Sequence, residues 1–359
     1  MKRVLVAMSG GVDSSVAAFL LKQQGYDCIG VTMKLYENET VGRRVGTCCS
    51  LDDIEDARAV AERIGIPYHV FNFTADFEGQ VIRRFVEGYE AGDTPNPCID
   101  CNRYLKFARL MERARQLGCD FVATGHYARI GQEDGLYTLR AGLDAQKDQS
   151  YVLYAMTQAQ LAHTLLPLGE LPKSEVRAIA ARQGFCNAHK HDSQDICFVP
   201  DGDYAAFLER LRGGAYPHGN FVDAAGHVLG EHKGYVHYTL GQRKGLGISA
   251  AAPLYVTAKN PAANTVTLGD NAALFSTVFF VGGVNWLDGT APQMPMRLAV
   301  CPRYHAKKYA ALVAPARPAG VVRVMLDTPA RAITPGQAAV FYEGDRVVGG
   351  GVICAAPQK

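Results

Sequence analysis

The sequence has no apolar run long enough to act as a secretory signal or to cross a membrane. After Met1, Lys2 and Arg3 only Val4–Met8 are apolar, which is too short for a signal-peptide core. The longest uncharged stretch, Asn271–Leu287, falls short of the about 20 residues that a spanning helix needs. These absences argue against export and against a membrane-spanning segment. They predict a cytoplasmic chain without a membrane partner, whose thiols are reduced.

The sequence also has no internal repeat and no low-complexity tract. With 48% hydrophobic and 20% charged residues, the composition excludes disorder over most of the chain, and 359 residues predict two or three domains. The net charge is only +2, but residues 271–359 hold nine Lys/Arg against four Asp/Glu. Such a surplus suits a polyanionic partner or an ordinary solvated surface, and the count alone does not choose between them.

Short apolar runs alternate with amphipathic segments over the first 125 residues, which predicts a parallel sheet covered by helices. Gly becomes frequent after residue 200, and the pattern is almost entirely β from about residue 271. We therefore expect an α/β domain over 1–200, a small mixed domain over 201–270 and an all-β domain over 271–359.

The most informative local feature is the segment Ser9–Ser15, with the sequence SGGVDSS, which lies between an expected strand and an expected helix. A Gly-rich turn leading into a helix N-terminus lets phosphate oxygens approach free backbone N–H groups. The segment lacks the Gly-Lys-Ser/Thr ending of a Walker loop and the spacing of the dinucleotide fingerprint. A plain strand-to-helix turn capped by Ser14 is the alternative.

Two cysteines, Cys98 and Cys101, follow Asn96 and Pro97 at the expected start of a helix, where the helix dipole lowers a thiol pKa. A metal knuckle or two idle thiols are the alternatives, but a four-Cys zinc site needs a second pair at similar spacing. The adjacent Cys48 and Cys49 do not provide it and remain unexplained. Cys197 closes the polar run 191–198 and, from its position alone, is equally a half-buried core residue.

These motifs together resemble the bacterial tRNA-specific 2-thiouridylases of the MnmA/TrmU family, within the PP-loop ATP pyrophosphatases. The resemblance spans the whole chain. It rests on residues 9–15, 94–102, 124–127 (TGHY), 147–151 (KDQSY), 192–198 (DSQDICF) and 238–247 (YTLGQRKGLG). It implies a Rossmann-like PP-loop catalytic domain with a parallel sheet, a small central tRNA-binding domain and a C-terminal tRNA-binding β-barrel.

The resemblance implies that ATP, with Mg²⁺, adenylates the C2 oxygen of a wobble uridine in tRNA for Lys, Glu or Gln. AMP then leaves as sulfur enters, and pyrophosphate is released in the first step. The residues that it places around ATP are Ala7, Met8, Ser9, Gly10, Gly11, Val12, Asp13, Ser14, Met33 and Gly125.

By the same resemblance, Cys197 carries the sulfur as a persulfide, and Cys101 is the nucleophile that frees it and forms a transient disulfide. The chain has Cys98 where many relatives have Asp, so the acid/base role of that Asp has no assigned residue here, although Asp100 is nearby. Cys98, Cys101 and Cys197 could instead be three ligands of an iron–sulfur cluster, an alternative that the sequence leaves open.

The resemblance also implies contacts to the anticodon loop of tRNA, with its target base extruded. The expected protein partner is a sulfur relay protein or a cysteine desulfurase, and the expected state is a monomer. The residues expected at the RNA are Asn96, Pro97, Cys98, His126, Asp148, Gln149, Ser150, Arg303, Tyr304 and Gln337.

Two other functions remain open at this point. A PP-loop synthetase acting on a small molecule would turn over without RNA and would have no use for Cys101 and Cys197. A tRNA-binding protein that holds ATP only as a structural ligand would not need Asp13 for thiolation.

Overall fold

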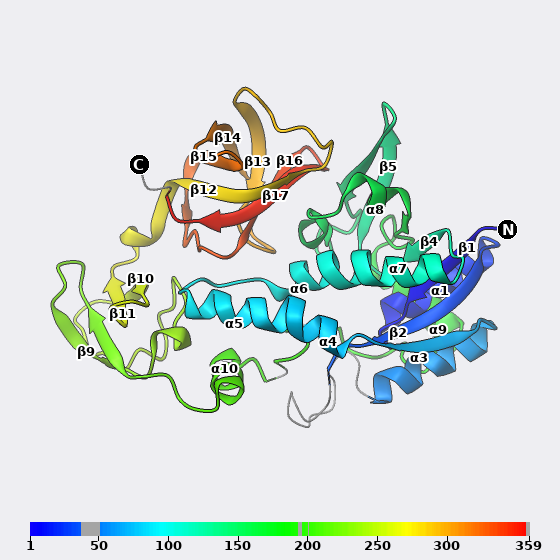
Figure 1. The fold of residues 1–359 in the computed structure, drawn as a ribbon, viewed down its shortest axis with the longest axis horizontal. Helices are drawn as coiled ribbons and strands as arrows, with labels where there is room; N and C mark the ends of the chain where they lie inside the picture. Colours follow the sequence, from blue (N-terminus) through cyan, green and yellow to red (C-terminus); the bar gives the residue numbers. More distant parts are fainter. Residues whose placement is uncertain (37–50, 193–195, 200, 357–359) are drawn as a thin grey trace.

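The computed structural model describes residues 1–36, 51–192, 196–199 and 201–356. Three sheets organise the chain: a parallel sheet near the N-terminus, a small mixed sheet and a β-barrel (Figure 1). The predicted fold class is therefore confirmed. Among the described residues, no helix combines the length and the apolar character needed to span a bilayer.

The N-terminal sheet has the order β3-β2-β1-β4-β7 with all its pairs parallel. Val4, Val6 and Met8 of the β1 region pack on one face, and Leu5 packs on the other, because side chains alternate along a strand. The strands are β1 (Arg3–Ala7), β2 (Asp27–Lys34), β3 (Tyr68–Asn72), β4 (Phe121–Ala123) and β7 (Thr164–Leu165).

Helices α1 (Val12–Gln23), α3 (Leu51–Ile64) and α9 (Lys173–Arg182) cover the face that carries Val4 and Val6. Two helical rods cover the opposite face and pack side by side (Figure 1). Each rod has a π-helical segment between α-helical ends. The first rod is α4 (Thr74–Phe77), η1 (Glu78–Ile82) and α5 (Arg83–Glu90), and the second is α6 (Pro97–Asp100), η2 (Cys101–Arg109) and α7 (Leu110–Gln116).

The small sheet follows α10 (Tyr204–Arg212) and has the order β10-β11-β8-β9. Its β11–β8 pair is parallel and its other pairs are antiparallel, so the sheet is mixed as expected. The elements are β8 (Gly219–Val222), β9 (Val228–His232), η4 (Tyr235–His237), β10 (Tyr255–Asn260), β11 (Thr265–Gly269) and η5 (Ala272–Leu274).

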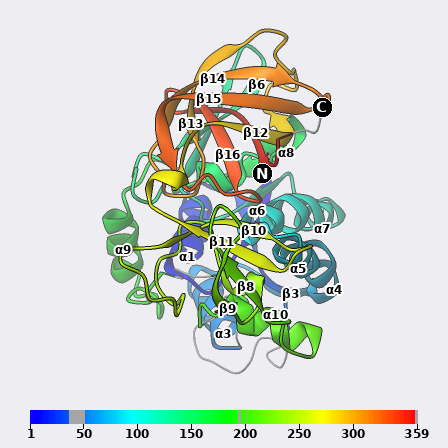
Figure 2. The same ribbon diagram turned by 90° about the vertical axis from the view of Figure 1, so that its left-hand side faces the viewer.

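Six antiparallel strands form the barrel, which closes through the β12–β17 pairing (Figures 1 and 2). A hydrophobic core that includes Val300, Val324 and Phe341 fills the barrel. The strands are β12 (Phe275–Trp286), β13 (Met296–Cys301), β14 (Tyr309–Ala316), β15 (Val321–Arg331), β16 (Ala338–Glu343) and β17 (Arg346–Cys354).

A hairpin from the N-terminal part of the chain extends the barrel sheet, which the sequence pattern does not indicate. Strands β5 (Ala128–Glu133) and β6 (Leu136–Ala141) pair with each other, and β6 joins β17 through Arg140–Arg346 and Leu139–Val347. The segment η3 (Ser150–Leu153) and helix α8 (Gln158–Ala162) pack in the same core, which also contains Val340 and Tyr342 of the barrel.

Candidate functional site

The SGGVDSS segment forms the turn from β1 to α1, as its sequence predicts. Gly10 has φ +74°, and a Cβ at this position would clash with the backbone of Asp53, so only glycine fits. The Ser14 hydroxyl accepts a hydrogen bond from the backbone N–H of Ser9 at 3.1 Å and donates one to the Gly11 carbonyl at 3.0 Å. Gly11, the N-cap residue of α1, has no side chain that could cap the first turn, so an anion can approach the N–H groups at this helix end.

The predicted nucleotide residues come together at the carboxyl ends of β1, β2 and β4. The backbone N–H of Met8 donates to the Val31 carbonyl at 2.8 Å, which holds the end of β1 beside the β2 residue Met33. A Cβ on Gly125, just beyond β4, would lie 2.8 Å from the backbone of Asp13 and Ser14. This strand edge is where parallel α/β sheets bind ligands.

A charged network lies beside the turn. The ammonium of Lys173, at the start of α9, lies 2.7 Å from both carboxylate oxygens of Asp13 and 2.8 Å from Asp192. The Tyr127 hydroxyl also donates to Asp13, at 2.7 Å. Burial alone would raise the pKa of Asp192, but the hydrogen bonds and charges of Lys147 and Lys173 lower it to about 2.

The sequence motifs do not predict Lys173, nor two further residues that support the turn. The Asn187 side-chain amide donates to the Gly10 carbonyl and to the Ser15 hydroxyl, both at 2.9 Å. Lys190 lies 2.6 Å from Asp53 and from Asp56 on α3 and 3.4 Å from the Gly10 carbonyl. No local pattern marks these three residues, because the turn residues and the α3 carboxylates that they contact are more than 130 positions away in the chain.

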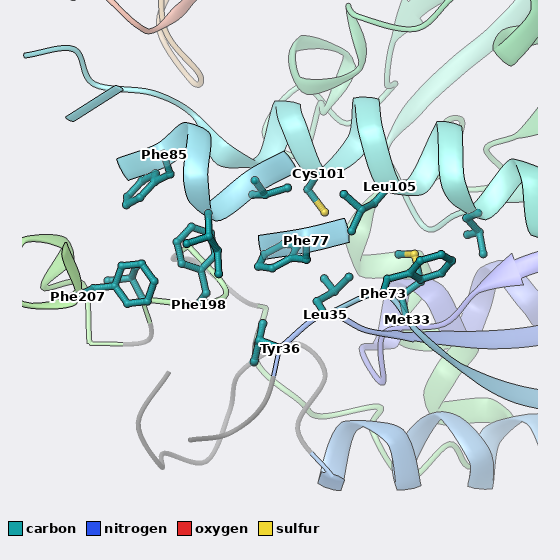
Figure 3. Packing of buried hydrophobic residues seen from close by; sticks show 14 of the residues in the cluster. Met33, Leu35, Tyr36, Phe73, Phe77, Phe85, Cys101, Leu105, Phe198 and Phe207 are labelled. Atoms are coloured by element: carbon teal, nitrogen blue, oxygen red, sulfur yellow. The ribbon is translucent and has the colours of Figure 1, made fainter. Parts of the chain in front are cut away.

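The Cys98–Cys101 pair lies at the start of the second helical rod. Asn96 is the N-cap residue of α6, and its side chain accepts a hydrogen bond from the Cys98 backbone N–H at 3.1 Å, with Pro97 in the first turn. Cys98 is exposed and Cys101 is buried. Figure 3 shows the Cys101 side chain pointing toward Phe77 and Leu105, into the core between the rods and the sheet.

Cys197 packs against the same buried cluster as Cys101. The hydroxyl of Tyr36 donates to the Cys197 carbonyl at 3.0 Å. The next residue, Phe198, is held among three aromatic rings, with centroid distances of 5.6 Å to Phe77, 5.2 Å to Phe85 and 5.2 Å to Phe207 (Figure 3). Residues 193–195 of the same motif and Cys48–Cys49 lie outside the described residues.

The loop that precedes Cys98 is attached to the barrel. The Thr94 backbone N–H donates to the Pro335 carbonyl at 2.9 Å, and the Gln337 side-chain amide donates to the Thr94 carbonyl at 2.6 Å. A Cβ on Gly336 would lie 2.7 Å from the Thr94 nitrogen. Gln337, expected at the RNA, thus contacts the loop that leads to Asn96.

Two other residues expected at the RNA are buried. Ser150 has no exposed surface, and its hydroxyl lies 2.9 Å from Asp148 and 3.2 Å from the Tyr342 hydroxyl. His126 is only 8% exposed, its Nδ1 lies 2.7 Å from the Thr124 hydroxyl, and burial holds its pKa well below the usual value. A contact between either side chain and RNA requires its neighbours to move.

The barrel residue Tyr304 lies beside the start of the helical rod. Its ring centroid is 5.5 Å from that of Tyr151. Burial and the charges of Asp148 and Cys98 raise the pKa of Tyr304 to about 12, and a hydrogen bond with Gln149 opposes this rise. Arg303, the preceding residue, is exposed. The structure therefore brings Tyr304 and Gln149 toward Cys98.

The described residues do not form a metal site. In the parts of the chain with described coordinates, no three His, Cys, Asp or Glu side chains are grouped so that they could hold a metal ion. The arrangement of Cys98, Cys101 and Cys197 in this structure therefore does not fit the iron–sulfur alternative.

Three family profiles match consecutive parts of the chain. Residues 2–201 match the tRNA methyl transferase HUP domain, residues 205–270 the tRNA methyl transferase PRC-barrel domain, and residues 276–353 the aminomethyltransferase beta-barrel domain.

Relatives match over nearly the full length. The tRNA-specific 2-thiouridylase MnmA of Clostridioides difficile (strain 630) is 49% identical over 354 residues, which is 98% of this chain and 98% of the relative. The protein of the same name from Desulforamulus reducens is 51% identical over 357 residues, covering 98% of this chain and 97% of the relative. Among solved structures, a 4-thiouridine synthetase–RNA complex with bound ATP is 19% identical with a TM-score of 0.37, covering 58% of this chain and 50% of that one. That likeness is too low to support a functional conclusion.

Proposed function

This chain belongs to the tRNA-specific 2-thiouridylase family, as its motifs predict, and from that premise we propose that it replaces the C2 oxygen of a tRNA wobble uridine by sulfur, using ATP. One observation carries the proposal. A single buried cluster contains Met33 and Cys101, and Ala7 and Cys197 pack against it. The nucleotide edge of the sheet and both reactive thiols therefore share one core.

In the first proposed step, ATP binds with its phosphates at Ser9–Ser15 and the uridine C2 oxygen attacks the α-phosphorus. Pyrophosphate leaves, and the uridine becomes an O-adenylate. The free N–H groups at the start of α1 support this step because they stabilise phosphate charge. Lys173 adds a cation next to Asp13, and Mg²⁺ accompanies the nucleotide.

In the second proposed step, a donor protein, either a sulfur relay protein or a cysteine desulfurase, loads Cys197 with a persulfide. The terminal sulfur attacks C2 of the adenylated uridine, and AMP leaves. The Cys101 thiolate then attacks the Cys197 sulfur, so that the S–S bond to the new thiouridine breaks and a Cys101–Cys197 disulfide forms. An external thiol must reduce this disulfide before the next turnover. Packing of both cysteines on one cluster supports the step.

The proposed RNA substrate is the anticodon loop of tRNA for Lys, Glu or Gln, with the wobble base extruded toward Cys98. Extruding a loop base costs less free energy than extruding one from a duplex. The exposed Cys98 and Arg303, with the half-buried Tyr304 beside them, support RNA approach at this point. The contacts of the buried residues His126 and Ser150 remain predictions.

The proposal is tested by mass spectrometry of wobble uridines in a strain that lacks its own enzyme. Wild-type protein should restore 2-thiouridine, whereas Cys101→Ser and Cys197→Ser should each lower it at least about 100-fold. Cys119→Ser is the matched control, because Cys119 is as buried as Cys101 and belongs to the same cluster but has no proposed chemistry. Restoration by either active-site variant would refute the two-thiol mechanism.

The same experiment separates the competing functions. In this strain a small-molecule synthetase would restore no 2-thiouridine, and a tRNA-binding protein that holds ATP only as a structural ligand would restore none either. A methyl transferase, the activity named in two of the family profiles, would leave both cysteines without a use. Thiolation that depends on Asp13, Cys101 and Cys197 is expected only of the proposed reaction.

A further inference from the structure

A group of charged and aromatic side chains on the second helical rod has no role in the chemistry above. The Tyr104 ring lies near two guanidinium groups, with the Cζ of Arg84 at 4.7 Å and that of Arg103 at 5.5 Å from its centroid. Arg103 and Tyr104 belong to η2, and Arg84 comes from α5 on the neighbouring rod. Both arginines are exposed, and the ring is half-buried.

One carboxylate, that of Asp100, faces this group. Burial raises the pKa of Asp100 to about 6, and the charges of Arg84 and Arg103 oppose that rise. Within the described parts of the chain, neither arginine has a carboxylate within ion-pair distance. Asp100 can balance the charge of at most one of the two guanidinium groups.

The group lies where the rod meets the barrel. The charges of Arg103 and Asp100 both act on Tyr154, whose pKa burial raises to about 12. The Tyr154 ring in turn lies against Gly350 of β17, because a Cβ on Gly350 would be 2.8 Å from that ring. The exposed Cys98 lies on the same rod, in the turn before Asp100.

We propose that Arg84, Tyr104 and Arg103 form a binding site for backbone phosphates of the substrate tRNA, beside the nucleotide that is modified. The proposal rests on the proposed function, since it identifies where that RNA is held. A guanidinium group presents a planar set of donors that matches a phosphate, and stacking on an aromatic ring orients it before the ligand arrives. Both guanidinium groups lie near the Tyr104 ring, so we assign the ring to positioning the arginines.

The salt dependence of tRNA binding tests the site directly. Each protein cation that neutralises a phosphate adds about 0.7 to 0.9 to the slope of log affinity against log salt concentration. Arg84→Gln and Arg103→Gln should each reduce the slope by about that amount and weaken binding about tenfold at physiological salt. Arg58→Gln is the matched control, because Arg58 is equally exposed but lies on α3, across the sheet from the rods.

Two further variants separate phosphate binding from a structural role. Asp100→Asn removes the opposing carboxylate and should tighten tRNA binding about threefold, the opposite sign to the arginine variants. Arg84→Lys keeps the charge but loses the planar fork, so it should keep the slope while weakening binding. Thermal melting of the arginine variants should stay near that of the wild type, since Arg84 and Arg103 are exposed.

The outcomes for the site and for the function are distinguishable because wild-type thiolation is measured in the same preparation. An active wild-type enzyme with arginine variants that bind tRNA with unchanged slope and affinity would overturn the site alone. A wild-type protein that binds tRNA with the expected slope but never thiolates it would overturn the proposed function and leave the site standing.

Discussion

At the scale of single residues, the site depends on two linked ion pairs, Asp13–Lys173 and Lys173–Asp192. They connect the nucleotide turn to the segment before Cys197. Lys173 lies between Asp13 and Asp192 and is only 10% exposed, so both of its ion pairs are well shielded from water. A shielded cation next to a phosphate-binding turn can move from a carboxylate to a phosphate oxygen when the nucleotide arrives. We infer that Lys173 sets the charge of the turn.

Lys173→Met should lower the rate of tRNA-dependent ATP–pyrophosphate exchange about 100-fold, because a charge-assisted contact to the phosphates is lost and Asp13 is left without its cation. Lys147→Met provides the comparison. Lys147 also pairs with Asp192, but it is 39% exposed and, among the described residues, does not pair with Asp13, so its loss should cost less than about tenfold. Equal losses in the two variants would show that Asp192, rather than Asp13, is the partner that matters.

Residues of this kind differ in how far the sequence reveals them. Gly10 could be predicted because its positive φ belongs to a tight turn between a strand and a helix, although its close approach to the Asp53 backbone is a tertiary contact. Lys173 could not, because nothing near position 173 shows that the folded chain carries its ammonium to Asp13, 160 positions earlier. Local patterns report backbone conformation, whereas such ion pairs depend on tertiary packing.

At the scale of elements, Cys197 is positioned by its neighbour rather than by a helix or strand of its own. Phe198 is almost fully buried among Phe77, Phe85 and Phe207. These three rings come from α4 and α5, the two α-helical ends of the first rod, and from α10. This aromatic anchor fixes the backbone that carries the thiol. The short segment around Cys197 can therefore hold a reactive group without regular secondary structure.

Phe198→Leu should release this anchor. We expect a loss of about 1–2 kcal/mol in the free energy of unfolding. We also expect faster alkylation of the Cys197 thiol, which peptide mass spectrometry measures. Phe341→Leu is the control, because Phe341 is equally buried but fills the barrel core. It should lose similar stability and leave the Cys197 alkylation rate unchanged. Equal acceleration in both variants would mean that global unfolding, not the anchor, exposes the thiol.

Most helices and strands can be predicted from the sequence where their pairing is local or regular. The strand–helix alternation predicted β1 to β4 because a parallel sheet buried on both faces needs apolar strands. The β5–β6 hairpin was missed as part of the barrel sheet, because its partner β17 lies about 200 positions further along the chain. Which edge a hairpin joins is decided by tertiary contacts that no local pattern records.

At the scale of the whole molecule, the three sheets meet near the loop that leads to Cys98. Asp93 and Thr94 lie at the end of the first rod, Thr94 bonds to the barrel at Pro335, and Lys259 reaches the same place from β10 of the small sheet. The Lys259 ammonium lies 5.9 Å from the Tyr89 ring centroid and makes no hydrogen bond. The junction therefore contains a poorly solvated charge.

This charge makes the stability of the junction depend on pH. Burial lowers the pKa of Lys259 to about 8, and the charge of Asp93 only partly opposes this. The unfolded chain holds the Lys259 proton up to about pH 10.5, so between pH 8 and pH 10.5 the unfolded state binds more protons than the folded state. The free energy of unfolding therefore rises with pH over this range. Relative to Lys259→Met, the wild type should gain up to about 3 kcal/mol in the free energy of unfolding over this range.

Urea unfolding at pH 7, 8, 9.5 and 10.5 measures that gain. Lys233→Met is the control, because Lys233 belongs to the same small domain but is exposed, and its variant should follow the wild-type pH profile. Tyrosine and cysteine titrations are common to all three proteins and cancel in the difference. If Lys259→Met and the wild type changed in parallel from pH 8 to pH 10.5, the Lys259 ammonium would be solvated in the folded protein. The contact between the small sheet and the end of the first rod would then be looser than its burial implies.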